Sequence, residues 1–333
     1  MYILDSSLKL FFSLFISIFL AGFVVNALPE EKERNDIVAY ASHYDCLLQV
    51  GSGDSIYVCG DRIGNPPDFL YENFVAFFSG FLSVENFSIP LFFISFFIYF
   101  SVIYVSVSVS KLWFYSLVFL LVDFRFYELG NNILRNGISL SFLMWFVYFN
   151  YKGFWRLALS NAFLSVASHI TVSPAYLVAG KFLGFWFVII SMLIIYLILY
   201  FLPFLLTYAP EVFQSKYHAY DVEFSHVDLS FLPLHYILIL IVSVFLVGLK
   251  GFYGFIFGLF LMFSYLSFLM SGSGIGYRFV NFAMPFASIL ASYIFYYIHR
   301  RLGRVALYFF SMVYLLFAFA LFCKNYEFIV RAY

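Results

Sequence analysis

The sequence predicts an all-α, polytopic integral membrane protein with about eleven transmembrane helices, within a range of roughly ten to twelve. Of its 333 residues, 64% are hydrophobic and only 11% are charged, and the mean hydropathy is +0.95. Soluble domains average about 25% charged residues, so this composition excludes the soluble globular class. Apolar stretches long enough to cross a bilayer recur along the whole chain, and we therefore treat residues 1–333 as a single transmembrane domain.

The first apolar stretch, residues 10–28, is longer than the apolar region of a cleaved signal peptide, which favours a retained first transmembrane helix. Further stretches cover residues 88–109, 111–129, 133–150, 153–169, 171–182, 183–206, 233–249, 251–270, 278–298 and 304–323. The total depends on residues 153–206, where Pro174, Gly180 and Lys181 interrupt the apolar sequence and leave two or three crossings open.

Basic residues beside the transmembrane helices set the orientation, because they concentrate on the cytoplasmic side of a membrane. They form four groups, which lie at His299–Arg304, at Lys111, at Lys152 with Arg156, and at Lys250. Placing all four inside requires three crossings within residues 153–206, which is why we favour eleven helices. The same orientation puts two long loops outside, residues 29–87 and residues 207–232.

The outer loop of residues 29–87 is acidic and contains two of the three cysteines, Cys46 and Cys59. An oxidising compartment would allow them to form a disulfide, but sequence spacing does not fix the Cα separation, so a disulfide and two free thiols both stay open. Near the end of the loop, Leu70, Phe74 and Phe77 fall on one helical face. This pattern predicts an interfacial helix on the outer leaflet.

Ionisable residues at the edges of transmembrane helices are costly, and each is a candidate functional residue. Arg125 and Glu128 are spaced to form an ion pair on one helix. Arg135 shares a polar stripe with Asn131 and Ser139 and has no carboxylate within one turn of sequence. Either its side chain reaches ordinary lipid headgroups, or it binds a specific anion.

Three further segments carry polar groups at the predicted outer side. His169 shares a face with Ser165, where it either caps the helix or bonds to a neighbouring helix, or else transfers a proton or contacts a phosphate. Arg278 follows a glycine-rich turn, residues 271–277, which is either a plain hairpin or a backbone cradle for an anion. The outer loop of residues 207–232 contains acidic residues and histidines without a metal-ligand motif, which favours a solvated loop.

These arginines and the histidine together indicate an anionic, membrane-borne ligand, and a lipid phosphate fits best because the arginine fork contacts phosphate oxygens in pairs. The 18 basic and 18 acidic residues sum to zero net charge, which gives no support to a nucleic-acid partner. No zinc-ligand or redox cysteine pattern is present in the sequence, and we expect neither a metal nor a cofactor.

Four short motifs occur in order along the chain: Arg34-Asn35-Asp36-Ile37-Val38-Ala39-Tyr40, Arg135-Asn136-Gly137-Ile138-Ser139, Ser168-His169-Ile170-Thr171 and Tyr277-Arg278-Phe279. With their membrane context they resemble the bacterial EpsG/Wzy-type polysaccharide polymerases, which make O-antigen, capsule or exopolysaccharide. The resemblance runs from about residue 30 to residue 298. One departure concerns Pro66-Pro67-Asp68-Phe69, where the family usually has Glu-Pro, so an acidic role there would fall to Asp68.

The resemblance implies transfer of a growing glycan from undecaprenyl diphosphate to the next lipid-linked repeat unit, at the periplasmic face of the bacterial inner membrane. It implies a GT-C-like helical architecture and a metal-independent glycosyltransferase. Arg135 and Arg278 would bind the diphosphate, with weaker contributions from Arg34 and Arg125. The proton acceptor or its orienter would be His169 or Asp36, and Tyr40 and Tyr277 would stack on sugars.

The implied partners are undecaprenyl-diphosphate-linked oligosaccharides, the lipid bilayer and a chain-length regulator. Two alternatives stay open. One is another polyprenyl-phosphate-dependent transferase that adds a single sugar. The other is a flippase or transporter of lipid-linked glycans, although the charged residues gather on one side rather than at mid-bilayer, where a transport path needs them.

Overall fold

The computed structural model describes residues 2–26, 36–50, 59, 69–81, 86–131, 133–169, 172–178, 190, 192–194, 196, 197, 201, 233–246, 251–270 and 274–331. The regular elements formed by these residues are helices, which confirms the all-α class. The chain divides into two compact units, and we describe each by itself. The first comprises Met1–Val109, Leu117–Val172 and Tyr314–Tyr333, and the second comprises Ser110–Ser116 and Ser173–Val313.

The first unit is built around α5 (Ser88–Val109), which packs against α1 (Tyr2–Asn26) and α8 (Leu134–Lys152). The predicted stretch 88–109 coincides with α5, because an apolar run there is bounded by polar Asn86 and Lys111. Its inward side chains include fully buried Leu91, which adds to an apolar core.

The predicted outer loop of residues 29–87 contains helices. They are α2 (Asp36–Val50) and α4 (Phe69–Ala76), and α4 continues as the π-helical turn η1 (Phe77–Phe81). The helix expected from Leu70 to Phe78 is therefore confirmed, and its place on a membrane surface stays a prediction. Phe74 and Phe77 are exposed, whereas Phe78 is buried and stacks on Phe93 of α5.

A break at Asp123 divides the predicted transmembrane stretch 111–129 into α6 (Trp113–Val122) and α7 (Phe124–Asn131). The expectation of one continuous helix there is wrong. The buried Asp123 carboxylate accepts the backbone N–H of Arg125 at 3.1 Å, which is the bond that an N-cap residue makes. Asp123 therefore starts a new helix where hydropathy alone would continue the old one.

The helices α8 and α9 (Trp155–Ser168) form a hairpin. Gly153 ends α8 in the left-handed conformation, with φ of 82°, and its N–H bonds to Asn150 O at 3.2 Å. Both helices were predicted from residues 133–150 and 153–169. At 14 residues, α9 is shorter than the roughly 20 residues that cross a bilayer without tilt or thinning.

The second unit contains α10 (Pro174–Val178), α13 (Leu234–Leu246), α14 (Gly251–Leu269) and the greater part of α15 (Gly274–Arg331). α14 packs against α10 and α13. Phe263 of α14 contacts Phe279, Phe282 and Phe286 of α15, a stripe spaced at one helical face.

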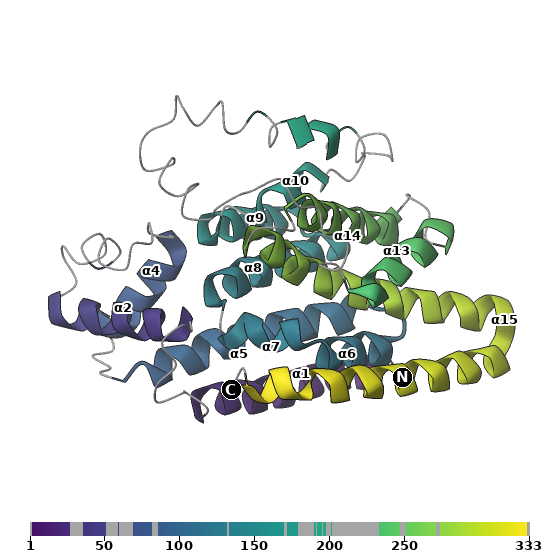
Figure 1. Ribbon diagram of the computed structural model, residues 1–333, viewed down its shortest axis with the longest axis horizontal. Coiled ribbons are helices and arrows are strands. Elements are labelled where there is room, and N and C mark those ends of the chain that lie inside the picture. The colour runs from purple at the N-terminus through teal and green to yellow at the C-terminus, as the bar shows by residue number, and fades with distance from the viewer. Residues whose placement is uncertain are drawn as a thin grey trace. The chain divides into compact units, whose positions relative to one another are not determined.

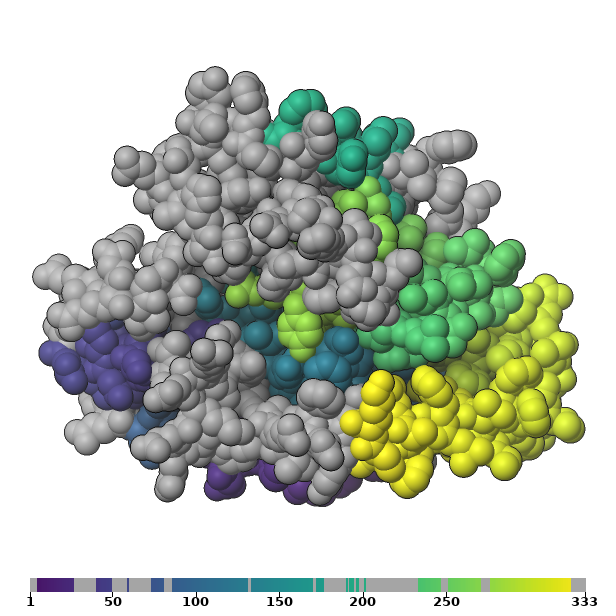
Figure 2. Space-filling model, viewed as in Figure 1, coloured from purple at the N-terminus to yellow at the C-terminus, as the bar shows by residue number. Residues whose placement is uncertain are grey.

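α15 consists of two arms separated at Gly303, whose φ of 84° and ψ of −176° are not helical. Figure 1 shows the chain reversing its direction between these arms. The reversal agrees with the two separate stretches predicted at 278–298 and 304–323. In the second arm, large apolar side chains such as Val305, Tyr308 and Met312 are exposed, and Figure 2 shows this arm at the surface of the molecule.

Four helices in the described residues are long and apolar enough to cross a membrane: Asp5–Asn26, Ser88–Val109, Gly251–Leu269 and Gly276–Lys324, the last of which includes the Gly303 reversal. Two shorter apolar helices are Trp113–Val122 and Leu234–Leu246. These helices support the prediction that the chain is a membrane protein. Of the three crossings predicted within residues 153–206, the first corresponds to α9, whereas residues 179–189 and most of residues 198–206 lie outside the described residues. The loop of residues 207–232 also lies outside them, so the count of eleven stays a prediction.

Candidate functional site

Arg135 lies in the first turn of α8 and is half-buried. Its guanidinium carbon is 6.0 Å from the centre of the Tyr40 ring, which α2 contributes and which is 7% exposed. A guanidinium at this distance from an aromatic face is attracted by the ring quadrupole. Two of the residues predicted for the site, 95 positions apart in sequence, are thereby brought together.

His43 is a third member of this cluster, and sequence analysis missed it. It lies one helical turn after Tyr40 on α2 and is only 4% exposed. Burial lowers the pKa of its imidazole below the ordinary value of 6.5, and the nearby positive charge of Arg135 lowers that pKa further. His43 is therefore neutral at physiological pH. Its spacing from Tyr40 was the available signal, but nothing local indicated that α2 would face α8.

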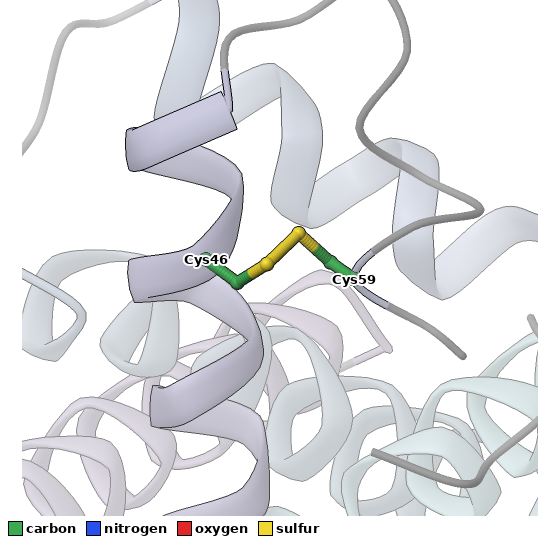
Figure 3. The surroundings of a disulfide bond; sticks show 2 residues. All are labelled: Cys46 and Cys59. Carbon is green, nitrogen blue, oxygen red and sulfur yellow. A yellow bond between two sulfur atoms is a disulfide. The ribbon is translucent and has the colours of Figure 1, made fainter. Parts of the chain in front are cut away.

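A disulfide holds α2 in place one turn beyond His43. Cys46 of α2 is bonded to Cys59 with a Cα separation of 5.8 Å, as Figure 3 shows. The question left open by the sequence is thus answered in favour of the bond. On the same helix, the fully buried Tyr44 packs on Phe87 with ring centres 5.5 Å apart, so both covalent and packing contacts fix the segment that carries Tyr40 and His43.

Gly137 allows the first turn of α8 to approach α7 closely. A Cβ at this position would collide with the backbone carbonyl of Leu129 and would lie 2.6 Å from the Cδ1 atom of Ile98. The glycine of the Arg135-Asn136-Gly137 motif therefore has a packing reason in this chain. Asn136 beside it is buried, and its Oδ1 has no hydrogen-bond partner within the described part of the chain.

Ser139 and Ser165 connect α8 to α9 through reciprocal hydrogen bonds. Ser139 Oγ donates to Ser165 O at 2.8 Å, and Ser165 Oγ donates to Ser139 O at 2.6 Å. Ser139 Oγ also lies 3.4 Å from the carbonyl oxygen of His169. Arg135 precedes Ser139 by one turn and His169 follows Ser165 by one turn, so both predicted residues belong to the same end of the α8–α9 hairpin.

His169 ends α9 in an extended conformation, and its backbone N–H donates to Ser165 O at 3.1 Å. This is a backbone bond that any residue can make at a helix end, so it does not decide between the sequence interpretations of the imidazole. The imidazole is 7% exposed. The proton-transfer role of the side chain therefore stays a prediction.

Arg125 lies near Asp123, with 3.4 Å between its Nη1 atom and Oδ1 of the carboxylate, and its guanidinium carbon is 4.5 Å from the centre of the Phe124 ring. Sequence analysis paired it with Glu128 and gave it a minor part in diphosphate binding. The buried Asp123 carboxylate offsets its charge. This contact fits a smaller electrostatic contribution from Arg125 than from Arg135.

Arg278 and Tyr277 lie in the first turns of α15, in the second unit, and both are half-buried. Gly276 before them packs so tightly that a Cβ would collide with the backbone carbonyl of Met270. The assignment of Arg278 and Arg135 to one diphosphate stays a prediction. Arg34 and Asp68 lie outside the described residues, and Asp36 is the first residue of α2, with a side chain that is likewise not described.

Within the part of the chain that the structure describes, no group of three or more metal-ligating side chains occurs. Comparison with known proteins found no matching family model, no similar curated protein and no similar solved structure.

Proposed function

We propose that the protein polymerises lipid-linked oligosaccharide repeat units at the outer face of the bacterial cytoplasmic membrane. The growing glycan is transferred from undecaprenyl diphosphate to a hydroxyl of the next lipid-linked unit. This proposal follows the motif resemblance, and the arrangement around Arg135 is the observation that supports it most directly. A half-buried arginine at a helix start, held against a disulfide-anchored helix, is suited to an anion that reaches it from the bilayer.

In this reaction a hydroxyl oxygen of the acceptor attacks the anomeric carbon of the donor. The new glycosidic carbon–oxygen bond forms as the bond to the diphosphate breaks, and the hydroxyl proton passes to a base. The diphosphate leaves with the bonding electron pair, so the main requirement is to stabilise its negative charge. Arg135 and Arg278 take this part, with Arg34 and Arg125 as weaker contributors.

His169 and Asp36 are the proton acceptors that the motifs suggest, and His43 becomes a third candidate. A neutral imidazole has a lone pair available for a proton, and burial beside Arg135 favours this neutral form of His43. The Tyr40 ring lies near the Arg135 guanidinium, and Tyr277 precedes Arg278 in the sequence, so these two aromatic rings are the candidates to stack on the sugars next to the diphosphate.

The test uses the purified full-length protein in sealed vesicles with radiolabelled undecaprenyl-diphosphate-linked repeat units. A ladder of products on a gel supports polymerisation. A single added sugar would assign the protein to the other transferases, and movement of substrate across the vesicle without new glycosidic bonds would assign it to the transporters.

Arg135→Ala should reduce ladder formation by roughly 10²–10³-fold, the effect of removing one group that stabilises developing negative charge. His169→Ala should abolish long products as well, with expression and membrane insertion intact. Arg156→Ala is the matched control, because Arg156 is an exposed arginine at the start of α9, with its guanidinium carbon 5.5 Å from the Trp155 ring centre. Normal ladders from Arg135→Ala would remove Arg135 from the site.

A further inference from the structure

Asn281 is a fully buried polar side chain in the first arm of α15. Its neighbours Val280 and Phe282 are fully buried apolar residues. Neither Oδ1 nor Nδ2 of Asn281 has a hydrogen-bond partner within the described residues. Buried amides are nearly always paired, so an amide with both ends unused requires an explanation.

The backbone carbonyl of Asn281 lacks its usual donor within the helix. Residue 285, four positions further on, is a proline inside the helix. Because proline has no N–H, it cannot donate the usual intrahelical bond to the carbonyl of Asn281. The carbonyl of Pro285 itself accepts Ser288 Oγ at 2.7 Å. Asn281 therefore presents one donor group and two acceptor oxygens at one level of the helix.

Further along α15, polar side chains on the same face as Asn281 do have hydrogen-bond partners. Ser288 and Ser292 are seven and eleven residues after Asn281, which places all three on one stripe of the helix. Ser288 Oγ lies 3.0 Å from Ser116 Oγ, and Ser292 Oγ accepts the backbone N–H of Leu112 at 2.9 Å. Polar groups on this stripe thus have protein partners at one end, whereas Asn281 has none among the described residues.

Asn281 lies one turn after Arg278, about 4.5 Å further along the helix axis. If Arg278 binds a diphosphate, the group attached to that diphosphate lies near this level. At neutral pH a phosphate accepts hydrogen bonds but does not donate them. It would therefore leave the side-chain Oδ1 and the backbone carbonyl oxygen of Asn281 without a donor. Sugar hydroxyls both donate and accept, and they match all three groups.

We propose that Asn281 and its backbone carbonyl contact a sugar of the lipid-linked substrate, beside the diphosphate held by Arg278. This inference rests on the proposed function. Asn281 is fully buried in the ligand-free chain. Binding of a sugar therefore requires the side chains around Asn281 to move aside.

The test compares two ligands, undecaprenyl diphosphate bearing one N-acetylglucosamine and undecaprenyl diphosphate alone, in binding to the full-length protein in detergent. Asn281→Leu keeps the approximate volume and removes the amide. We expect it to weaken binding of the sugar-bearing lipid by roughly tenfold, to leave the sugar-free lipid unaffected, and not to lower the thermal midpoint. Asn281→Ala should give the same pattern of ligand selectivity.

Ser243→Ala is the matched control, since Ser243 of α13 is also fully buried and its Oγ also has no hydrogen-bond partner among the described residues. It should change neither affinity. Unchanged binding of both lipids by Asn281→Leu, or equal weakening of both, would overturn the proposal, as would failure of both Asn281 variants to fold. Because binding is measured without turnover, sugar-selective binding by a wild-type protein that makes no ladder would refute the proposed function and retain this inference.

Discussion

Ser139 and Ser165 each donate a side-chain hydrogen bond to the other's backbone carbonyl, at 2.8 Å and 2.6 Å. Both side chains are fully buried. The pair therefore locks α8 against α9 in one register, and that register determines how Arg135 and His169 are placed at the same end of the hairpin. Interhelical hydroxyl bonds of this kind are a common means of joining helices in membranes.

Removing one serine should loosen this end of the hairpin. Ser139→Ala removes the hydrogen bond from Ser139 Oγ to Ser165 O and keeps the one from Ser165 Oγ to Ser139 O. We therefore expect a loss of about 1 kcal/mol in stability. The thermal midpoint in detergent should fall and ladder formation should weaken. Ser160→Ala is the control, because exposed Ser160 bonds only within its own helix, to Arg156 O at 3.1 Å.

Gly137 should not tolerate a methyl group. Gly137→Ala forces a Cβ into the Leu129 carbonyl and the Ile98 side chain, and overpacking of this kind costs about 1–3 kcal/mol. We expect a lower thermal midpoint and reduced polymer. Gly22→Ala in α1 is the counterpart, since its Cβ would meet no atom of the described residues within 4 Å, and a helical alanine should stabilise by roughly 0.5–1 kcal/mol. Equal stability of the two variants would contradict the close approach of α7 and α8.

The Cys46–Cys59 bond should stabilise the segment that carries Tyr40 and His43. Its partners are 13 positions apart, and the chain-entropy account gives about 3 kcal/mol for a loop of this length. Cys59→Ser, or reduction with a thiol, should lower the thermal midpoint and the ladder yield together. Cys323→Ser should do neither, because Cys323 is a free, exposed cysteine. An unchanged midpoint after reduction would show that α2 does not depend on the bond.

The stability of the protein should fall at acidic pH in a manner that depends on His43. Burial and then Arg135 lower the pKa of His43 in the folded chain, while the unfolded chain keeps the ordinary value of 6.5. Between these two values the unfolded state binds more protons, so the free energy of unfolding decreases as the pH falls below 6.5. Above 6.5 both states are neutral at His43 and this effect is absent.

Thermal midpoints measured from pH 7.5 to pH 5 in roughly half-unit steps would test this linkage. The decline towards acidic pH should be smaller in His43→Gln than in the wild type. In Arg135→Ala it should be intermediate, because burial, the larger cause, remains. Identical slopes in His43→Gln and the wild type would show that other groups cause the decline.

Sequence predicted those features that depend on neighbouring residues. The bounds of α5 agree because an apolar run ends at polar residues on both sides, and the two arms of α15 were separated because a basic cluster surrounds Gly303. The break at Asp123 was missed although the signal is local. A carboxylate that bonds the N–H two residues later starts a helix, but within an apolar run hydropathy masks this effect.

The site was predictable only in part. Tyr40 and Arg135 were selected as separate motifs, and their proximity depends on tertiary packing that brings Tyr40 of α2 beside the start of α8, which no periodicity encodes. His43 was missed for the same reason. The disulfide stayed open because a Cα separation of 5.8 Å is a property of the fold and not of spacing. The Asn136 Oδ1 and the Asn281 amide, which lack partners among the described residues, emerge only when burial and hydrogen bonds are known.

The reversal at Gly303 depends on a single backbone conformation, with φ of 84°, and apart from its chain neighbours no atom of the described residues lies within 4 Å of where a Cβ would be. Since no described side chain packs against this position, a short reporter peptide inserted there should leave the first and second arms of α15 intact. The insertion would stand among Arg300, Arg301 and Arg304. Cleavage of the inserted peptide by a protease added to one side of a sealed vesicle would report the orientation of the whole chain.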